Sequence, residues 1–346
     1  MGFSNRLIYW YLKNKRDLPW RKGNNVYHIW LSEIILQQTR IEQGTNYYLK
    51  FCENFPTIFD LAETSEERVL KLWQGLGYYS RARNLHFTAK FIVENYNGEI
   101  PNNYNDLIKL KGIGDYTASA IASICFNEPK AVVDGNVYRV LSRYYNICTP
   151  INSLKGVKQF KQIAQEIIYK EDPGTYNQAI MELGALICKP KKAECNNCPI
   201  QKGCNAYLNQ NVYSFPVKEK KIRIKKRFFN FLVFDITGHR TILEKRQEKD
   251  IWQNLYQFPL VESENEVDEF KLSEAKVLKD LIKEYEYEIA LFNSKPILHK
   301  LTHQHILIKF WIIKPNSDLE GAIEWKDVSN FAVPVPVHNF IENFRK

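Results

Sequence analysis

Apolar side chains recur every three or four positions through the first 187 residues, a spacing that predicts amphipathic helices. The segment 26–38 is the plainest case, because Ile29, Trp30 and Ile34 fall on one face of a helix. Similar stripes, separated by clusters of Gly, Pro and Asn, predict further helices over residues 81–95, 116–126, 137–145, 157–169 and 178–187. No sustained alternation of apolar and polar residues occurs before residue 228, so we expect this part of the chain to be all-α.

The pattern changes after residue 228. Residues 228–236 predict a strand, Thr237-Gly238 a hairpin turn, and residues 241–245 the returning strand. The remaining elements that the pattern predicts are a helix over 273–283, a strand over 306–313 and a closing helix over 334–344. This mixture is typical of a small α+β domain.

Charge is distributed unevenly along the 346 residues, whose net charge is +9. Residues 1–216 carry 26 Lys and Arg against 19 Asp and Glu, residues 217–227 carry 7 against 1, and residues 228–346 carry 15 against 19. A polyanion would therefore be held by the first part of the chain and by the basic stretch. Pattern and charge together predict a helical domain over 1–208, a basic linker over 209–227 and an α+β domain over 228–346.

Composition excludes several classes of protein. Hydrophobic residues make up 45% and charged residues 25% of the chain, which is typical of a soluble globular protein and not of a disordered or collagen-like one. No run of about 18 apolar residues occurs, so we expect no membrane span. The N-terminus lacks the apolar core of a signal peptide, and we expect a cytoplasmic protein.

Four of the seven cysteines lie within 17 residues and have the spacing C-x6-C-x2-C-x5-C. They are Cys188, Cys195, Cys198 and Cys204. Four thiolates at such spacing fit zinc or a [4Fe–4S] cluster, and the spacing alone does not decide between them. The other three cysteines occur singly in apolar surroundings, which predicts buried thiols in a reducing compartment.

A glycine pair and two carboxylates are candidates for chemistry. Gly112 and Gly114, in Leu110-Lys111-Gly112-Ile113-Gly114 between two predicted helices, would let backbone N–H groups approach an anion such as a phosphate. A plain turn is the alternative. Glu33 lies among apolar residues, which predicts a raised pKa, although a lone Glu on a helix is usually solvated. Asp134 begins the segment Val133-Asp134-Gly135-Asn136-Val137, where a lone Asp is commonly just an N-cap.

Together these segments resemble one family. The Glu33 segment, LKGIGDYT, VDGNVYRV and the four-cysteine loop are similar to those of the MutY-type adenine DNA glycosylases, within the endonuclease III superfamily. The resemblance extends from Leu18 to Cys204 and continues more weakly to the C-terminus. It implies an all-α helix-hairpin-helix glycosylase domain with an iron–sulfur loop, followed by an α+β, Nudix-like domain that recognises 8-oxoguanine.

The same resemblance implies a function in base excision DNA repair. The substrate would be double-stranded DNA containing 8-oxoguanine:A or G:A mispairs, bound by a monomer in the cytoplasm, at the bacterial nucleoid. Glu33 would be the general acid that protonates adenine, and Asp134 would stabilise the oxocarbenium-like sugar or trap it covalently. Bifunctional relatives place a lysine where this chain has Tyr116, so a monofunctional glycosylase is expected. Tyr116 and Asn136 would hold the carboxylates and the water.

Further residues are assigned to DNA or to the cofactor by the resemblance. Those implied to read or line the flipped adenine, or to lie at the opposite base, are Trp20, Arg21, Gln38, Tyr78 and Gln178. Gly112 and Gly114 would hold the phosphate backbone, and the four cysteines would hold a structural [4Fe–4S] cluster. Leu301-Thr302-His303 stands where the family has a Phe-Ser-His lesion-reading loop, with the aromatic residue replaced. No Nudix acid cluster follows residue 228, so pyrophosphate hydrolysis is not expected.

Two other functions are weighed against this one. A glycosylase–lyase acting on oxidised pyrimidines is opposed by Tyr116 and by the C-terminal domain. An iron–sulfur DNA-binding protein without activity is opposed by the presence of both Glu33 and Asp134.

Overall fold

The computed structural model describes residues 2–219 and 224–344. It divides into two compact units, one formed by Met1–Glu63 with Asn84–Lys220 and the other by Thr64–Arg83 with Lys221–Lys346. Residues 220–223 of the predicted basic linker lie outside the described residues. No helix in the described part of the chain is long and apolar enough to cross a membrane.

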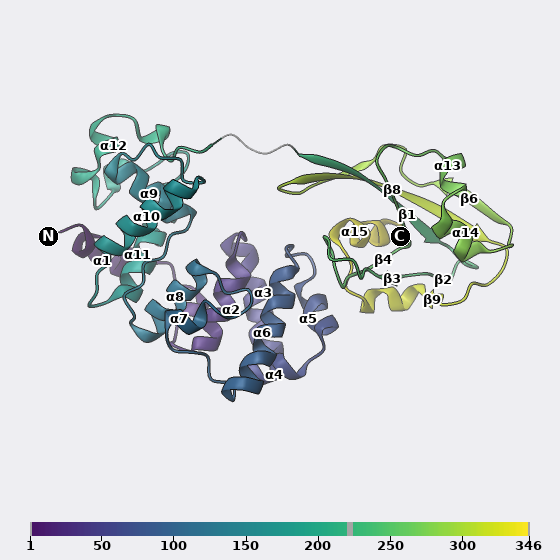
Figure 1. Ribbon diagram of the computed structural model, residues 1–346, viewed down its shortest axis with the longest axis horizontal. Coiled ribbons are helices and arrows are strands. Elements are labelled where there is room, and N and C mark those ends of the chain that lie inside the picture. The colour runs from purple at the N-terminus through teal and green to yellow at the C-terminus, as the bar shows by residue number, and fades with distance from the viewer. Residues whose placement is uncertain (1, 220–223, 345–346) are drawn as a thin grey trace. The chain divides into compact units, whose positions relative to one another are not determined.

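The first unit is helical (Figure 1). Its helices are α1 (Phe3–Asn14), α2 (Val26–Leu36), α3 (Ile41–Asn54), α4 (Ile58–Glu63), most of α6 (Ser80–Tyr96), α7 (Tyr104–Leu107), α8 (Asp115–Phe126), α9 (Gly135–Tyr145), α10 (Leu154–Ile167), α11 (Pro173–Leu186) and α12 (Asn205–Leu208). Among the described residues no strand precedes β1, which confirms the all-α prediction. The six predicted helices correspond to α2, α6, α8, α9, α10 and α11, whereas the sequence pattern did not predict α1 or α3.

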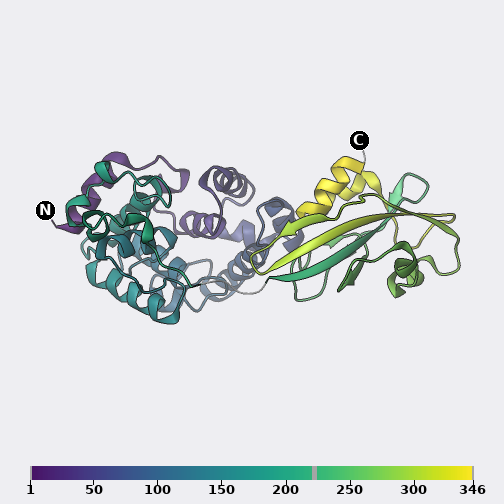
Figure 2. The ribbon, with the colours of Figure 1, turned by 90° about the horizontal axis from the view of Figure 1, so that it is seen from above.

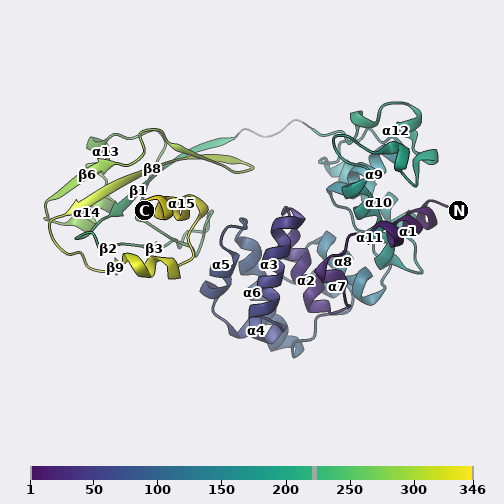
Figure 3. The same cartoon turned by 180° about the vertical axis from the view of Figure 1, so that it is seen from behind.

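Helix starts in this unit follow from side chains that accept the first free backbone N–H groups. Asn25, Ser153 and Asp172 do so at the starts of α2, α10 and α11. The core forms where α11 packs against α1, α8 and α9, an arrangement seen from behind in Figure 3. Val137 and Leu183 are completely buried there. This packing fixes the first turn of α9 and the inner face of α11, on which several candidate residues lie.

The second unit contains a mixed sheet and a smaller number of helices. Its strands are β1 (Lys225–Phe234), β2 (Arg240–Thr241), β3 (Glu244–Lys245), β4 (Tyr256–Gln257), β5 (Leu260–Ser263), β6 (Tyr287–Leu291), β7 (Ile297–Lys300), β8 (Gln304–Pro315) and β9 (Ile323–Glu324). Its helices are α5 (Glu66–Trp73), α13 (Glu269–Ser273), α14 (Lys276–Ile282) and α15 (Val335–Phe344). The order in the main sheet is β5-β1-β8-β6, and β7 also pairs with β8. The β1 and β8 strands are parallel, and the other pairs are antiparallel.

The α+β prediction for this half is confirmed, with two corrections of detail. Residues 241–245 are not a strand returning along β1, since β2 pairs with β9 and β3 with β4. Both edges of β1 are already occupied by β5 and β8, so a returning strand has no partner there. The helix predicted over 273–283 corresponds to α14, which begins only at Lys276 because Ala275 is extended, and α13 was not predicted.

Two apolar layers cover the main sheet, one on each face. On one face the Phe340 ring of α15 stacks on Phe310 of β8, with ring centroids 4.1 Å apart. On the other face Leu278 of α14 packs in a cluster with Leu232 and Trp311. Figure 2 shows α15, in yellow, on its own side of the two long strands. Side chains on both faces of β1 and β8 therefore pack against a helix.

The segment Thr64–Arg83 belongs to the second unit, which the predicted domain bounds did not anticipate. The Lys71 ammonium donates a hydrogen bond to the Phe331 carbonyl at 2.9 Å. The Val333 backbone N–H donates to Gln74 Oε1 at 3.1 Å, and Lys245 pairs with Glu67 at 2.9 Å. These contacts hold the Gly75–Arg81 loop, which includes Tyr78, within the same compact unit as the predicted lesion-reading loop.

Candidate active site

Glu33 lies on α2, a helix with apolar residues on most of its surface. Trp30, Ile34 and Ile35 are buried around it, and Glu33 itself is half-buried. Burial, together with the nearby Asp134 carboxylate, raises the pKa of Glu33 to about 7. The Tyr116 hydroxyl opposes the rise by hydrogen bonding to the carboxylate. The raised pKa predicted from the surrounding apolar residues is therefore found in the structure.

Tyr116 stands at the second position of α8, directly after the glycine hairpin. Its hydroxyl hydrogen-bonds to Glu33 and lies 3.2 Å from the Met181 sulfur on α11. Burial and the two neighbouring carboxylates, Glu33 and Asp134, raise the pKa of Tyr116 well above its usual value. The phenol therefore stays neutral and supplies a hydrogen bond to the carboxyl group.

Asp134 caps the first turn of α9, as the simpler interpretation of the sequence predicts, and it also faces the Glu33 site. Its Oδ1 accepts hydrogen bonds from the backbone N–H groups of Asn136 and Val137 at 2.9 and 2.8 Å. The Asn136 side-chain amide donates to Oδ2 at 2.7 Å. Burial raises the pKa of Asp134, although these hydrogen bonds favour the ionised form and limit the rise. Capping fixes the orientation of the carboxylate.

Arg139, which the sequence analysis did not identify, forms hydrogen bonds to this capped turn. Its Nη2 donates to Asn136 Oδ1 and to the Gly184 carbonyl, both at 2.8 Å. Its Nε donates to the Cys188 carbonyl at 2.6 Å. The signal that could have identified it is a charged residue within the apolar face of α9, one turn after the cap. Arg139 thus joins the Asp134 turn to the first cysteine of the loop.

Gly112 and Gly114 of the hairpin differ in whether the backbone and the neighbouring atoms would allow a side chain. Gly112 has φ +82°, and a Cβ there would lie 2.6 Å from the Cβ of Asn84, so a side chain meets both backbone strain and a close contact. Gly114 is extended and stands directly before α8, whose first turn has no side-chain cap. A Cβ at Gly114 would meet nothing within 4 Å, so the space around this residue is open. This geometry is typical of a turn that receives an anion.

Arg21 and Gln178 are brought together through a tyrosine that the sequence analysis missed. The Tyr11 hydroxyl donates to Gln178 Oε1 at 3.0 Å, and the Arg21 guanidinium lies over the Tyr11 ring. Arg21 also donates to Glu182 at 2.9 Å. Burial would raise the pKa of Glu182, but hydrogen bonds from Arg16 and Arg21 outweigh it and lower the pKa to about 2. Glu182 therefore remains ionised and anchors Arg21.

Trp20 and Gln38 belong to the same helical unit. Trp20 is half-buried, and its ring packs edge-on against Tyr48 of α3 with centroids 5.3 Å apart. Gln38 is exposed, with φ +55°, in the turn that follows α2. Next to it, Gln37 donates to the Thr117 hydroxyl at 3.2 Å and ties this turn to α8.

The four cysteines line one cavity between α9, α11 and the loop that follows. Its other walls are mostly apolar and include Val140, Leu183 and Ile200. Burial raises the pKa of the Cys198 thiol to about 12, and the neighbouring cysteines raise it further. All four are free thiols. No group of three or more His, Cys, Asp or Glu side chains in residues 2–219 and 224–344 is arranged to hold a metal ion.

Arg143 secures this loop. Its guanidinium donates to the Cys188 sulfur at 3.3 Å, to the Lys189 carbonyl at 2.8 Å and to the Val212 carbonyl at 3.0 Å. Four sulfurs around one apolar cavity, with a cation against one of them, provide the donors for a group bound by thiolates. Arg143 is a further residue that the sequence analysis missed.

In the second unit the structure brings two predicted residues together. Tyr78 has φ +49°, is 51% exposed and lies with its hydroxyl 3.3 Å from the Thr302 hydroxyl, 224 positions later. Thr302 and His303 are exposed at the turn between β7 and β8, and Leu301 is half-buried. The loop after α5 and the predicted lesion-reading loop thus meet through two hydroxyl groups.

Two family comparisons agree with this architecture. Residues 31–183 match the family described as an HhH-GPD superfamily base excision DNA repair protein, and residues 231–343 match the NUDIX domain family. The chain is 35% identical over 354 residues to the adenine DNA glycosylase of Buchnera aphidicola subsp. Schizaphis graminum, and the alignment covers 99% of both proteins. It is 43% identical over 214 residues to the human adenine DNA glycosylase, which covers 59% of this chain and 39% of the human protein.

Solved structures share the helical fold. A thermostable thymine-DNA glycosylase aligns with a TM-score of 0.55 and 27% identity, covering 60% of this chain and 95% of that one. Endonuclease III from a non-covalent complex with DNA aligns with a TM-score of 0.52 and 21% identity, over 60% of this chain and 94% of that one. The predicted helix-hairpin-helix and Nudix-like domains are both confirmed, in the predicted order. Because a 35% identical relative aligns over nearly the whole of both proteins, this chain belongs to the adenine DNA glycosylase family.

Proposed function

We propose that this protein is a monofunctional base-excision-repair glycosylase that hydrolyses the N-glycosidic bond of adenine paired with 8-oxoguanine or guanine in duplex DNA. The observation that carries the proposal is the environment of Glu33, whose pKa of about 7 leaves much of it protonated near neutral pH. A carboxylic acid in that state can give a proton to a leaving base. The names of the relatives support adenine as that base.

The side chains around Glu33 support a hydrolytic mechanism. Glu33 would give its proton to N7 of adenine, so that the base leaves neutral with the electron pair of the broken C1′–N9 bond. Asp134, oriented by Asn136 and by its cap on α9, would stabilise the positive charge on the sugar or bond to C1′ until water replaces it. Water then adds at C1′ and loses a proton. Tyr116 cannot form a Schiff base, which opposes strand cleavage.

We infer that Cys188, Cys195, Cys198 and Cys204 hold a [4Fe–4S] cluster, which fits the cavity they line and the thiolate ligands they supply. When bound, such a cluster cross-links the loop and adds no step to the hydrolysis. The chain's own residues transmit that rigidity. Arg143 grips the loop backbone, and Arg139 joins the Cys188 carbonyl to Asn136 in the Asp134 turn.

Recognition of the base opposite adenine is proposed for Tyr78, Thr302, His303 and Gln38. The hydrogen-bond distance between Tyr78 and Thr302 supports a joint role for the first two, because it places a ring suited to a base step beside a hydroxyl. Leu301, half-buried beside them, would supply apolar contact in place of an aromatic ring. Phosphate contacts are proposed for the hairpin of Gly112 and Gly114.

One incubation tests the proposal. Duplexes containing 8-oxoguanine:A, G:A or thymine glycol:A are mixed with the protein, and each sample is divided and analysed with and without alkali. We expect strand breaks at adenine in the first two duplexes, and only after alkali, because a monofunctional glycosylase leaves an intact abasic strand. Breaks without alkali, or at thymine glycol, would favour the glycosylase–lyase alternative. Binding without any break would favour an inactive DNA-binding protein.

A further inference from the structure

The predicted lesion-reading loop depends on the base of its own hairpin for its position. Thr302 and His303 are exposed at the turn between β7 and β8. Leu301 N–H donates to the Gln304 carbonyl at 2.9 Å, and Lys225 N–H donates to the His303 carbonyl at 3.1 Å. The backbone therefore closes the turn and pairs its foot with β1, and the Gln304 side chain makes one further contact there.

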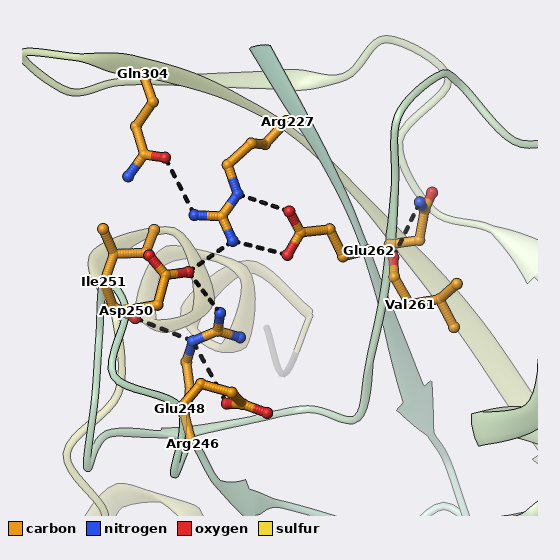
Figure 4. Close-up of polar contacts among 9 residues, drawn as sticks. Arg227, Arg246, Glu248, Asp250, Ile251, Val261, Glu262 and Gln304 are labelled. Atoms are coloured by element: carbon orange, nitrogen blue, oxygen red, sulfur yellow. Dashed lines mark hydrogen bonds and ion pairs between the residues drawn. The ribbon is translucent and has the colours of Figure 1, made fainter. Parts of the chain in front are cut away.

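That contact is with Arg227, which lies beneath the hairpin and is 8% exposed (Figure 4). Its Nη1 donates to Gln304 Oε1 at 3.1 Å. Its Nε and Nη2 both donate to the Glu262 carboxylate of β5 at 2.7 Å, a bidentate pair. Its Nη2 also donates to Asp250 at 2.6 Å. One guanidinium thus joins β1, β5, the loop before β4 and the first residue of β8.

A second arginine completes the cluster. Arg246 Nη2 donates to the same Asp250 oxygen at 2.9 Å, and its Nε donates to the Ile251 carbonyl at 3.0 Å. Burial would raise the pKa of Asp250, but the hydrogen bonds and charge of Arg227, together with Arg246, lower it to about 2. The Phe229 ring lies against both guanidinium groups. Hydrogen bonds from Arg227 and Arg246 thus converge on Asp250.

The position of Arg227 in the sequence suggests a different role, which the structure opposes. It is the last cation of the basic stretch 217–227, where a phosphate contact would be expected. In the structure its charge is matched by two carboxylates, so little of it remains for DNA. The Arg227 side chain is 10% exposed and its two carboxylate partners are 31% and 39% exposed, so these ion pairs are only partly desolvated.

We propose that Arg227 is a positioning residue for mispair discrimination: through Gln304 it sets the hairpin that presents Thr302 and His303 to the base opposite adenine. This inference rests on the proposed function of that hairpin. Arg227 itself touches neither the lesion nor the reacting atoms. Its loss should therefore change the choice between 8-oxoguanine and guanine, while the rate of excision at G:A stays close to that of the parent protein.

Gln304 gives the sharpest test because replacing it leaves the Arg227 ion pairs in place. Gln304→Met has similar length but cannot accept the hydrogen bond, whereas Gln304→Glu can. We expect Gln304→Met to reduce the ratio of single-turnover rates at 8-oxoguanine:A and G:A by about 3- to 10-fold, which lies within the net contribution of one hydrogen bond. Gln304→Glu should keep the parent ratio, because any repulsion of DNA by its added charge acts on both duplexes.

Arg227→Lys separates positioning from phosphate binding. Lysine keeps the charge but cannot bond Glu262 bidentately and reach Gln304 at once, so we expect the same direction of change as in Gln304→Met. A phosphate contact would instead tolerate lysine. Arg240→Ala is the matched control, since Arg240 is also ion-paired in this unit, with Asp318. Rates are divided by the active fraction of each preparation, which removes the effect of partial unfolding.

The outcomes are distinct. An unchanged ratio in Gln304→Met, an equal loss of both rates, or the same change in Arg240→Ala would overturn the positioning role. If the parent protein excises adenine without preferring either mispair, the proposed function of the hairpin fails first, and the variants are not needed to show it.

Discussion

Glu33 and Thr302, proposed to act on the two bases of one mispair, have opposite surroundings. Glu33 is half-buried among apolar side chains of α2, and both the Tyr116 hydroxyl and the Asp134 carboxylate affect its pKa. Thr302 is exposed at the end of a hairpin, with only the Tyr78 hydroxyl beside its own. In the first case the protein removes water from the functional group, and in the second it leaves the group open.

The difference follows from what each group would do. A carboxyl group holds a proton near neutral pH only if its ionised form is poorly solvated, so burial is part of its chemistry. A group that distinguishes two bases needs access to the base edge, and its precision must come from neighbours that the DNA does not touch. Asn136 and Arg139 support the first site, while Arg227 and Gln304 support the second.

The largest effect is expected from a substitution in the cysteine loop, which is hydrogen-bonded to the helical site through Arg139. Cys198→Ser removes one of the four thiols that line the cavity, and we expect little folded protein, loss of the yellow-brown colour and weak DNA binding. Cys148→Ser is the control, because Cys148 lies outside the cavity and is exposed, which corrects the prediction that it is buried. Iron analysis, absorbance and circular dichroism report the result. Stoichiometric zinc without iron in parent protein purified without air would contradict the assignment.

The next effect concerns the proton itself. Glu33→Gln keeps the shape of the side chain but cannot donate a proton, so we expect a loss of excision of about 10²- to 10⁴-fold with mispair binding retained. The exposed Glu42→Gln should behave as the parent does. In the parent, excision should fall as the pH rises through about 7, where Glu33 ionises. A single-turnover rate within about tenfold of the parent's would show that Glu33 is not the acid.

These two sites also differ in how far the sequence predicts them. Helical spacing predicted α2 and α9, and the apolar neighbours of Glu33 predicted its raised pKa, because both depend on residues close in the chain. Arg139 and Glu182 were not predicted. Most of their partners lie far along the chain, such as the Cys188 carbonyl and Arg21, and a buried charge is recognisable only once those partners are placed.

The second unit was less predictable for the same reason. The strands over 228–236 and 306–313 were found, but their pairing was not, since the parallel contact of β1 with β8 joins residues about 80 positions apart. The inclusion of Thr64–Arg83 in this unit has no local signal either. A truncation after Arg227 would therefore remove partners of Lys71 and Gln74, so single substitutions are the cleaner test of recognition.

A smaller effect should appear in stability. The folded protein keeps a proton on Glu33 between its ordinary pKa of 4.5 and about 7, whereas the unfolded chain loses it. Burial of Glu33 therefore costs stability increasingly as the pH rises through this interval, up to about 3–4 kcal/mol. We expect Glu33→Gln to be more stable than the parent at pH 8 and nearly equal at pH 5, measured by denaturant unfolding. A difference independent of pH would contradict this cost of ionisation.

The smallest effect tests the exposed site. Thr302→Val keeps the shape of the side chain and removes the hydroxyl, and we expect the preference for 8-oxoguanine:A over G:A to fall by about tenfold, since one such group is worth about 1–3 kcal/mol of discrimination. Thr302→Ser should retain the preference. Tyr78→Phe removes the partner hydroxyl, 3.3 Å away, and leaves the ring. If the two hydroxyls act as a pair, the double variant should lose no more than the larger single loss, measured as single-turnover rate ratios at fixed salt. Additive losses would mean that Tyr78 and Thr302 meet the DNA independently, and an unchanged preference in Thr302→Val would place discrimination elsewhere in the chain.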